Sequence, residues 1–185
     1  LSTLGGKTAG TVTVSNAVVI SGTQSQVTAA LVTGATKVEA GSALVTIGDD
    51  DGVTLNAEDL SAIGGETGGA VTVSNAVNIV GTTAQVTAAL VTDATKVSVS
   101  DATVALDDGE TPTISQLNDI ADATDGAVTA TLAANTLANF ATLATEGTDV
   151  ITVTVNDDDA VNLNAEDLSA LGGKTAGTVT VSNAV

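Results

Sequence analysis

The sequence predicts a β-solenoid, a mixed α/β fold in which short parallel strands and short helices wind into a right-handed stack of coils. Three observations predict it: an internal repeat, strand-like alternation of Val with Thr or Ser, and short helical patterns at regular intervals. The helical patterns recur with a mean spacing of roughly 28 residues, within the range typical of repeat architectures. We therefore expect about six coils, each made of a strand, a turn and a short helix.

The internal repeat is the strongest of these signals. Residues 1–18 and 168–185 differ at a single position, and a third, less similar copy occupies residues 60–77. We expect one continuous segment, residues 1–185, that is a window of a longer repeat array. The expected two-coil units are approximately 1–59, 60–119 and 120–167, with the next repeat beginning at 168.

Strand-like stretches lie between the helical patterns. They cover residues 11–14, 37–39, 43–47, 70–73, 96–99, 127–132 and 150–155. Two kinds of coil are expected. In one kind, Val-Ser-Asn-Ala-Val continues the strand into the helix, as at 14–18 and 73–77. In the other kind, an acidic turn intervenes.

The helical patterns carry their own start and stop signals. Thr23 with Gln26, and Thr82 with Gln85, predict capping boxes, in which a hydroxyl and an amide satisfy free N–H groups reciprocally. Glycines that we expect to end the helices are Gly34, Gly64-Gly65 and Gly172-Gly173. Helices of about eight residues are unstable alone in water, so each coil needs a stacked neighbour.

The composition argues against catalysis and against nucleic-acid binding. The chain has no His, Cys or Arg, one aromatic residue (Phe140), four Lys and 22 carboxylates, for a net charge of −18. The common general bases and thiolate nucleophiles are therefore missing, and phosphate contacts would be few. No apolar run approaches the roughly 20 residues of a membrane span. We expect no enzyme, no required cofactor, no nucleic-acid partner and no membrane insertion.

Three acidic turns are the only clusters that resemble a chemical site. Their carboxylates could supply oxygen ligands to Ca²⁺, although neither the EF-hand spacing nor the glycine-rich calcium nonapeptide occurs. The alternative is a solvated turn whose charge keeps other chains away from an exposed strand edge. The candidate calcium ligands are Asp49, Asp50, Asp51, Asp107, Asp108, Glu110, Asp157, Asp158 and Asp159.

Two other functions fit the residues less well. A glycosidase uses paired carboxylates in a cleft, but this chain has no Trp or Tyr to stack on a sugar. Ice binding by ranks of Thr-x-Thr is disfavoured because Lys37-Val38-Glu39 and Lys96-Val97-Ser98 interrupt the rank. The four Thr-x-Thr pairs are Thr11/Thr13, Thr129/Thr131, Thr152/Thr154 and Thr178/Thr180.

With repeats such as VTVSNAVNIVGTTAQVTAAL and VNLNAEDLSALGG, the chain resembles the repeat regions of giant secreted bacterial surface proteins. These are the giant cell-surface proteins of marine cyanobacteria and the long acidic repeat adhesins of Gram-negative bacteria. The resemblance covers the whole chain through its composition and repeat style. It implies an extracellular fibrous or surface-layer role and carries over no functional residue. The missing calcium nonapeptide departs from the calcium-folded adhesins.

Together these observations predict a structural protein of the cell surface that forms an elongated filament or stalk. The expected partners are copies of itself stacked end to end or the continuation of the same chain, with lateral bundling of filaments. The alternative is an adhesin stalk, made rigid by Ca²⁺, that carries distant ligand-binding domains. An ice-binding solenoid is the weaker second alternative.

Overall fold

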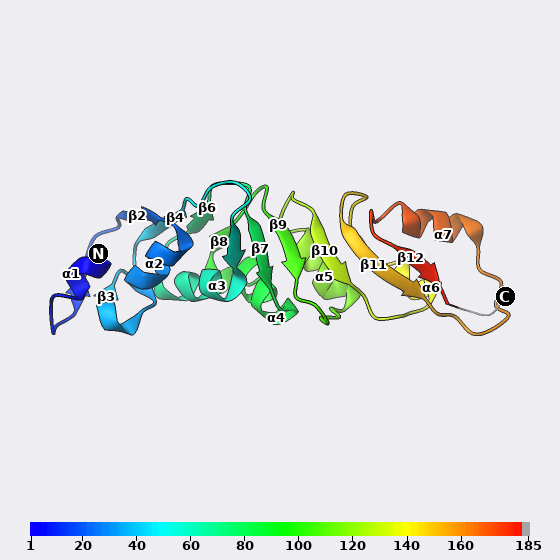
Figure 1. Cartoon of the computed structure of the whole chain (residues 1–185), viewed down its shortest axis with the longest axis horizontal. Coiled ribbons are helices and arrows are strands. Elements are labelled where there is room, and N and C mark those ends of the chain that lie inside the picture. The colour runs from blue at the N-terminus through cyan, green and yellow to red at the C-terminus, as the bar shows by residue number, and fades with distance from the viewer. Residues whose placement is uncertain (183–185) are drawn as a thin grey trace.

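The computed structural model describes residues 1–182 and is an elongated α/β structure with the two termini at opposite ends (Figure 1). Within these residues, twelve strands, in runs of one to three, lie between or after the seven α-helices along the chain. The helices are α1 (Ser2–Gly5), α2 (Gln24–Leu31), α3 (Ala57–Glu66), α4 (Thr83–Val86), α5 (Ile114–Ala121), α6 (Leu137–Phe140) and α7 (Ala165–Gly172). Among these residues, no helix is long and apolar enough to cross a membrane.

Every strand pair is parallel, and the strands form three sheets. One sheet pairs β1 (Val12–Thr13) with β3 (Val38–Glu39). The second has the order β2 (Val19–Gly22), β4 (Leu44–Ile47), β6 (Val71–Val73), β8 (Val97–Ser98). The third runs β5 (Thr54–Asn56), β7 (Asn78–Gly81), β9 (Thr103–Leu106), β10 (Val128–Thr131), β11 (Val150–Val155), β12 (Val179–Val181).

Within each sheet, every strand but the last pairs with a strand further along the chain, at a regular step that we call a coil. The step is about 25 residues, which is within the range of the repeats in solenoid proteins. The shortest step joins Thr129 to Val150, and the longest steps include the one from Val45 to Val71. The number of residues between paired strands is smaller than the spacing of roughly 28 residues between the helical patterns in the sequence. The difference arises because the loop between a strand and its following helix lengthens, from none before α3 to residues 156–164 before α7.

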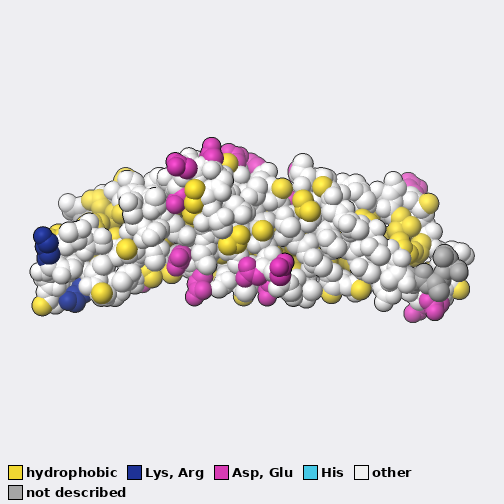
Figure 2. Space-filling view, in the orientation of Figure 1, with side chains coloured by type: hydrophobic (Ala, Val, Ile, Leu, Met, Phe, Trp, Pro, Cys, Tyr) yellow, Lys and Arg dark blue, Asp and Glu magenta, His cyan; other side chains and the backbone are white. Residues whose placement is uncertain are grey.

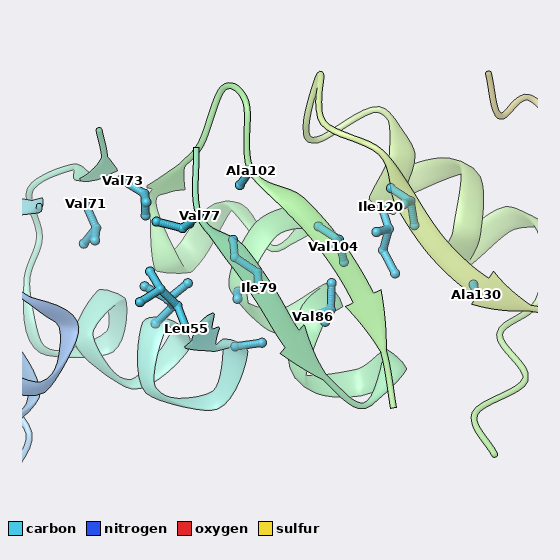
Figure 3. Packing of buried hydrophobic residues seen from close by; sticks show 14 of the residues in the cluster. Leu55, Val71, Val73, Val77, Ile79, Val86, Ala102, Val104, Ile120 and Ala130 are labelled. Carbon is cyan, nitrogen blue, oxygen red and sulfur yellow. The ribbon is translucent and has the colours of Figure 1, made fainter. Parts of the chain in front are cut away.

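One apolar core runs along the inside of the stacked strands. Leu55, Ile79, Val104 and Val128 are partners in successive strands, and each is at most 1% exposed. Figure 3 shows the first three of these side chains. Because successive side chains of a strand point to opposite faces, the Val/Thr alternation turns Val inward and Thr outward. The helices cover the core, with Leu60, Ile63, Leu117 and Ile120 fully buried.

All seven expected strand stretches contain a strand, and β12 repeats the first of them near the end of the chain. The structure adds four strands that the alternation did not predict, β2, β5, β7 and β9. The expectation that Val-Ser-Asn-Ala-Val carries the strand into the helix is wrong. At residues 73–77 the chain leaves β6, turns a corner and begins β7 at Asn78, and only then enters α4.

The helix starts agree with the sequence, but only one of the three expected glycine ends does. Gly172-Gly173 ends α7, whereas α2 ends at Leu31 with Val32 as its cap and Gly34 begins a separate 3-10 turn. The capping boxes at Thr23–Gln26 and Thr82–Gln85 form, and a third forms at Thr113–Gln116. Gly64-Gly65 does not end α3, which continues to Glu66. A Cβ at position 64 would lie 2.2 Å from the carbonyl oxygen of Thr95, so this glycine lets the next coil approach the helix backbone.

Candidate functional site

The three acidic turns each leave a strand of the sheets. Asp49, Asp50 and Asp51 follow β4; Asp107, Asp108 and Glu110 follow β9; and Asp157, Asp158 and Asp159 follow β11. In the space-filling view, acidic side chains gather at separate places along the molecule (Figure 2). Within residues 1–182, no group of three or more carboxylates is close enough together to hold a metal ion. Calcium binding by these nine residues stays a prediction.

One carboxylate of each turn binds the start of a helix in the preceding coil. Asp49 Oδ2 accepts a hydrogen bond of 2.6 Å from the backbone N–H of Gln24, the first residue of α2. Glu110 Oε2 accepts one of 2.8 Å from Thr83 in α4. Asp157 Oδ2 accepts one of 2.9 Å from Leu137 in α6.

These bonds satisfy groups that a helix leaves open. The first N–H groups of a helix have no partner within the helix, and the N-terminal end carries partial positive charge. A carboxylate is therefore a favourable acceptor there. Because the acceptor belongs to another coil, each bond caps a helix and joins two coils at once. The acidic turns thus have a structural role that neither sequence interpretation included.

Hydrogen bonding also changes the acidity of Glu110. The hydrogen bond from the backbone N–H of Thr83 lowers the pKa of Glu110 below its ordinary value of 4.5. The ionised carboxylate is the better acceptor for this bond, so the bond favours the charged form. Glu110 is consequently ionised in the folded chain down to a lower pH than an isolated glutamate.

The first acidic turn is also tied to the coil that follows it. Asp51 Oδ1 accepts a hydrogen bond of 3.0 Å from the backbone N–H of Ala76. The side-chain amide of Asn75 donates to the backbone carbonyl of Asp49. The turn therefore contacts α2 on one side and the corner after β6 on the other, while Asp50 is exposed.

Asp149 is a buried carboxylate that the sequence patterns do not single out. It is 4% exposed and accepts hydrogen bonds from the backbone N–H groups of Val128 (2.7 Å) and Glu146 (2.8 Å). Its partner Val128 belongs to the neighbouring strand β10. Charged groups are seldom buried without partners, and here the backbone of two segments supplies them. Asp149 therefore fastens β10 to the turn before β11.

A Thr-x-Gly motif forms another fastening between coils. In four copies the N–H of the glycine donates to the Thr hydroxyl two residues earlier, at Thr8, Thr67, Thr124 and Thr175. Three of these hydroxyls also donate to a carbonyl of the preceding coil: Thr67 to Ala43, Thr124 to Ala102 and Thr175 to Ile151. The motif is visible in the sequence as a recurring spacing, but its role depends on the stacked coil.

The glycine of this motif is required by the close approach of the neighbouring coil. A Cβ at Gly69, Gly126 or Gly177 would lie 2.2, 2.3 or 2.4 Å from a backbone carbonyl oxygen of the preceding coil. Real Cβ atoms do not approach backbone oxygens so closely. Gly10 differs, because the nearest atom to its Cβ position is Thr8 Oγ1 at 3.8 Å.

The Thr-x-Thr pairs do not lie in one array. Thr131 is the partner of Thr152, and Thr154 is the partner of Thr180, so three pairs occupy neighbouring strands β10 to β12. The fourth pair, at β1, belongs to the separate two-stranded sheet.

Open hollows lie beside several of the helices. One, of about 380 Å³, lies between α6 and α7 and is lined by Phe140, Leu163, Asn164 and Lys174 among others. Lys174 already donates to the carbonyls of Ala141 (2.9 Å) and Leu143 (2.5 Å) at the end of α6. Another hollow lies at the N-terminal end of the molecule.

Comparisons of the chain with protein-family models, curated proteins and solved structures gave no match.

Proposed function

We propose that this chain is a structural segment of an extracellular filament, stalk or surface layer, folded as a solenoid and without catalytic activity. In this proposal the coils wind in one continuous right-handed stack, and each coil stabilises the coils packed against it. Binding modules would belong to other parts of the assembly. The acidic, Cys-free repeat style supports placement at a cell surface.

The observation that carries this proposal is where the polar groups of the described chain are used. The carboxylates of Asp49, Glu110, Asp157 and Asp149 all bind backbone N–H groups. The Thr-x-Gly hydroxyls bind carbonyls of neighbouring coils. An enzyme directs such polar side chains into a cleft. In this chain they join one coil to the next, and that arrangement favours a load-bearing role.

A concatemer tests the proposal. The sequence repeats after residue 167, so residues 1–167 can be joined in line two and three times and closed with residues 168–185. If the chain is a structural spacer, each added unit lengthens the particle by the same increment without widening it, as measured by negative-stain electron microscopy. Units that collapse side by side, or that move as beads on flexible joints, would contradict the proposal.

The calcium-stiffened adhesin stalk differs from this proposal in its response to a chelator. A structural chain held by carboxylate-to-backbone bonds keeps its urea midpoint when EDTA replaces Ca²⁺. A stalk that requires Ca²⁺ loses stability and contour length under the same exchange. The ice-binding interpretation has its own test, because an ice-binding face produces thermal hysteresis in the isolated chain.

A further inference from the structure

Three Asp-Gly pairs occur in the chain, and such pairs can rearrange without an enzyme. The amide nitrogen of the glycine attacks the side-chain carboxyl carbon of the aspartate, and a five-membered succinimide ring closes. Glycine favours this attack because it has no Cβ and its backbone rotates easily. Ring closure needs rotation of both the side chain and the peptide plane, so hydrogen bonds that hold either group oppose it. The pairs are Asp51-Gly52, Asp108-Gly109 and Asp125-Gly126.

The first pair is held at both reacting groups. The N–H of Gly52 donates a hydrogen bond of 2.8 Å to the carbonyl of Ala76. Asp51 Oδ1 accepts a hydrogen bond of 3.0 Å from the N–H of the same residue. Rotation of either group toward the other therefore breaks a bond between the acidic turn and the next coil. The fold protects Asp51-Gly52 from ring closure.

The pair at residues 125 and 126 is held through its glycine. The N–H of Gly126 donates to Thr124 Oγ1 at 3.1 Å. A Cβ at Gly126 would lie 2.3 Å from the carbonyl oxygen of Ala102, so the backbone of the preceding coil lies directly against this glycine. The peptide cannot rotate there without separating the two coils. Asp125 is exposed, so the protection of this pair comes from the glycine alone.

Asp108-Gly109 is held at neither group. Asp108 is exposed, and a Cβ at Gly109 would have nothing within 4 Å. Within residues 1–182, neither the Asp108 carboxylate nor the Gly109 N–H forms a hydrogen bond. Gly109 has a φ of +87°, which glycine adopts without strain. The bond that closes this turn joins the N–H of Glu110 to the carbonyl of Asp107 at 3.1 Å, so it leaves both reacting groups free.

The acidic turn after β11 lacks the glycine. There Ala160 follows Asp159, in a turn closed at 3.2 Å by the N–H of Val161 and the carbonyl of Asp158. Ala160 has a φ of +62°, in the same left-handed region as Gly109. Its methyl group hinders attack by its own nitrogen on the carboxyl carbon of the preceding residue. Among the three acidic turns, the turn after β9 therefore combines a glycine with unrestrained reacting groups.

We infer that Asp108-Gly109 is a site of spontaneous backbone modification, at which the folded chain converts Asp108 to β-linked isoaspartate. The Gly109 nitrogen bonds to Asp108 Cγ, while its proton and the carboxyl hydroxyl leave together as water. Water then opens the ring. Cleavage of the new bond restores aspartate, whereas cleavage of the bond to the backbone carbonyl carbon of Asp108 directs the chain through Cβ and Cγ. One water leaves and one enters, so the mass is unchanged and one carboxylate remains.

The modification acts on a contact between coils. The β-linkage adds one carbon to the backbone, close to Glu110. Glu110 Oε2 lies 2.8 Å from the N–H of Thr83, the first residue of α4, and caps that helix. A hydrogen bond of this length is lost when its acceptor moves by a further bond length. Isoaspartate at position 108 therefore weakens the bond by which this acidic turn holds the preceding coil.

Peptide mapping compares the three pairs in one sample. The chain is incubated for weeks at neutral pH, once folded and once unfolded in guanidinium chloride. Electron-transfer fragmentation, which distinguishes the two linkages of equal mass, then measures isoaspartate at each pair. In the folded chain we expect it to accumulate faster at Asp108 than at Asp51 or Asp125. Unfolding should raise the rates at Asp51 and Asp125 several-fold and change the rate at Asp108 least, because only the first two are held by the fold.

Two variants at one position supply the controls. Asp108→Glu keeps the charge but needs a six-membered ring, which closes far more slowly, so this variant should stay unmodified at position 108. Asp108→Asn closes the five-membered ring faster, with loss of ammonia, so its stability is measured on fresh protein. A folded chain in which Asp51 or Asp125 reacts as fast as Asp108 would overturn the inference. The same ratio of the three rates in folded and unfolded chains would also overturn it.

The effect on the helix cap has a separate readout. We expect the urea midpoint of the aged chain to fall toward that of fresh Glu110→Gln, in proportion to the isoaspartate at position 108. Ageing should leave the midpoint of Glu110→Gln unchanged, because the charged cap is already absent. A midpoint that keeps its initial value after conversion of Asp108 would overturn the link between the modification and the cap. An equal fall in Glu110→Gln would do the same.

Discussion

At the scale of single residues, the acidic side chains act as caps between coils. Asp49, Glu110 and Asp157 occupy corresponding places after three strands, and each accepts the first N–H of a helix in the preceding coil. Their neighbours Asp50 and Asp108 are exposed, so adjacent carboxylates in one turn have different roles. The high negative charge therefore has a structural component that the net value alone does not show.

Glu110 gives this role a pH dependence. Its pKa is lowered in the folded chain, so as the pH falls the unfolded chain takes up the proton first. The stability that the carboxylate contributes is fully present above its ordinary value of 4.5 and is lost as the pH falls through the folded-state pKa. We expect Glu110→Gln to lower the urea midpoint near neutral pH and to have a smaller effect below pH 4.5.

The control for this measurement lies in the same turn. Asp108→Asn removes one charge from an exposed side chain, so the midpoint should change little at either pH. If Asp108→Asn and Glu110→Gln shift the midpoint equally and with the same pH profile, the effect comes from net charge. The capping role of Glu110 would then be rejected.

At the scale of elements, stacking depends on places where backbones touch. Gly69 precedes β6, and a Cβ there would lie 2.2 Å from the carbonyl oxygen of Ala43 and 3.2 Å from Leu44 Cδ2. Gly65 lies in α3 with nothing within 4 Å. The same substitution at these two glycines therefore separates a contact between coils from a purely local preference.

We expect Gly69→Ala to destabilise the chain by about 1–3 kcal/mol, because the neighbouring backbone must shift to make room. Gly65→Ala should instead stabilise it by up to about 1 kcal/mol, because alanine is the better helix former. Urea unfolding of both variants measures the two free energies. Equal effects of the two substitutions would show that the coils do not approach at Gly69 as described.

The elements also show what could be predicted from the sequence. Strands with clean alternation, such as Val71-Thr72-Val73, and helices that begin with a capping box could be predicted because their signals are local. Strands β2 and β7 could not, because Val19-Ile20-Ser21-Gly22 and Asn78-Ile79-Val80-Gly81 lack alternation and run directly into a helix cap.

The candidate site, like the fold, could be predicted from the sequence only in part. The acidic turns were visible as clusters of Asp, but their acceptor role was not, because the donors lie 20 to 27 residues earlier in the chain. Asp149 gives no local signal either, since one of its partners, Val128, becomes adjacent only when β10 and β11 pair. The Thr-x-Gly spacing could have been noticed, and only stacking explains it.

At the scale of the whole molecule, the central claim is that the chain is a rod of stacked coils whose polar groups serve stacking. A compact chain of 185 residues would have a radius of gyration of about 16 Å. Small-angle X-ray scattering extrapolated to zero concentration measures this radius for the single chain. We predict a radius clearly above that of the compact chain, with a pair-distance distribution skewed toward long distances. A radius equal to the compact value, with a symmetric distribution, would contradict the claim.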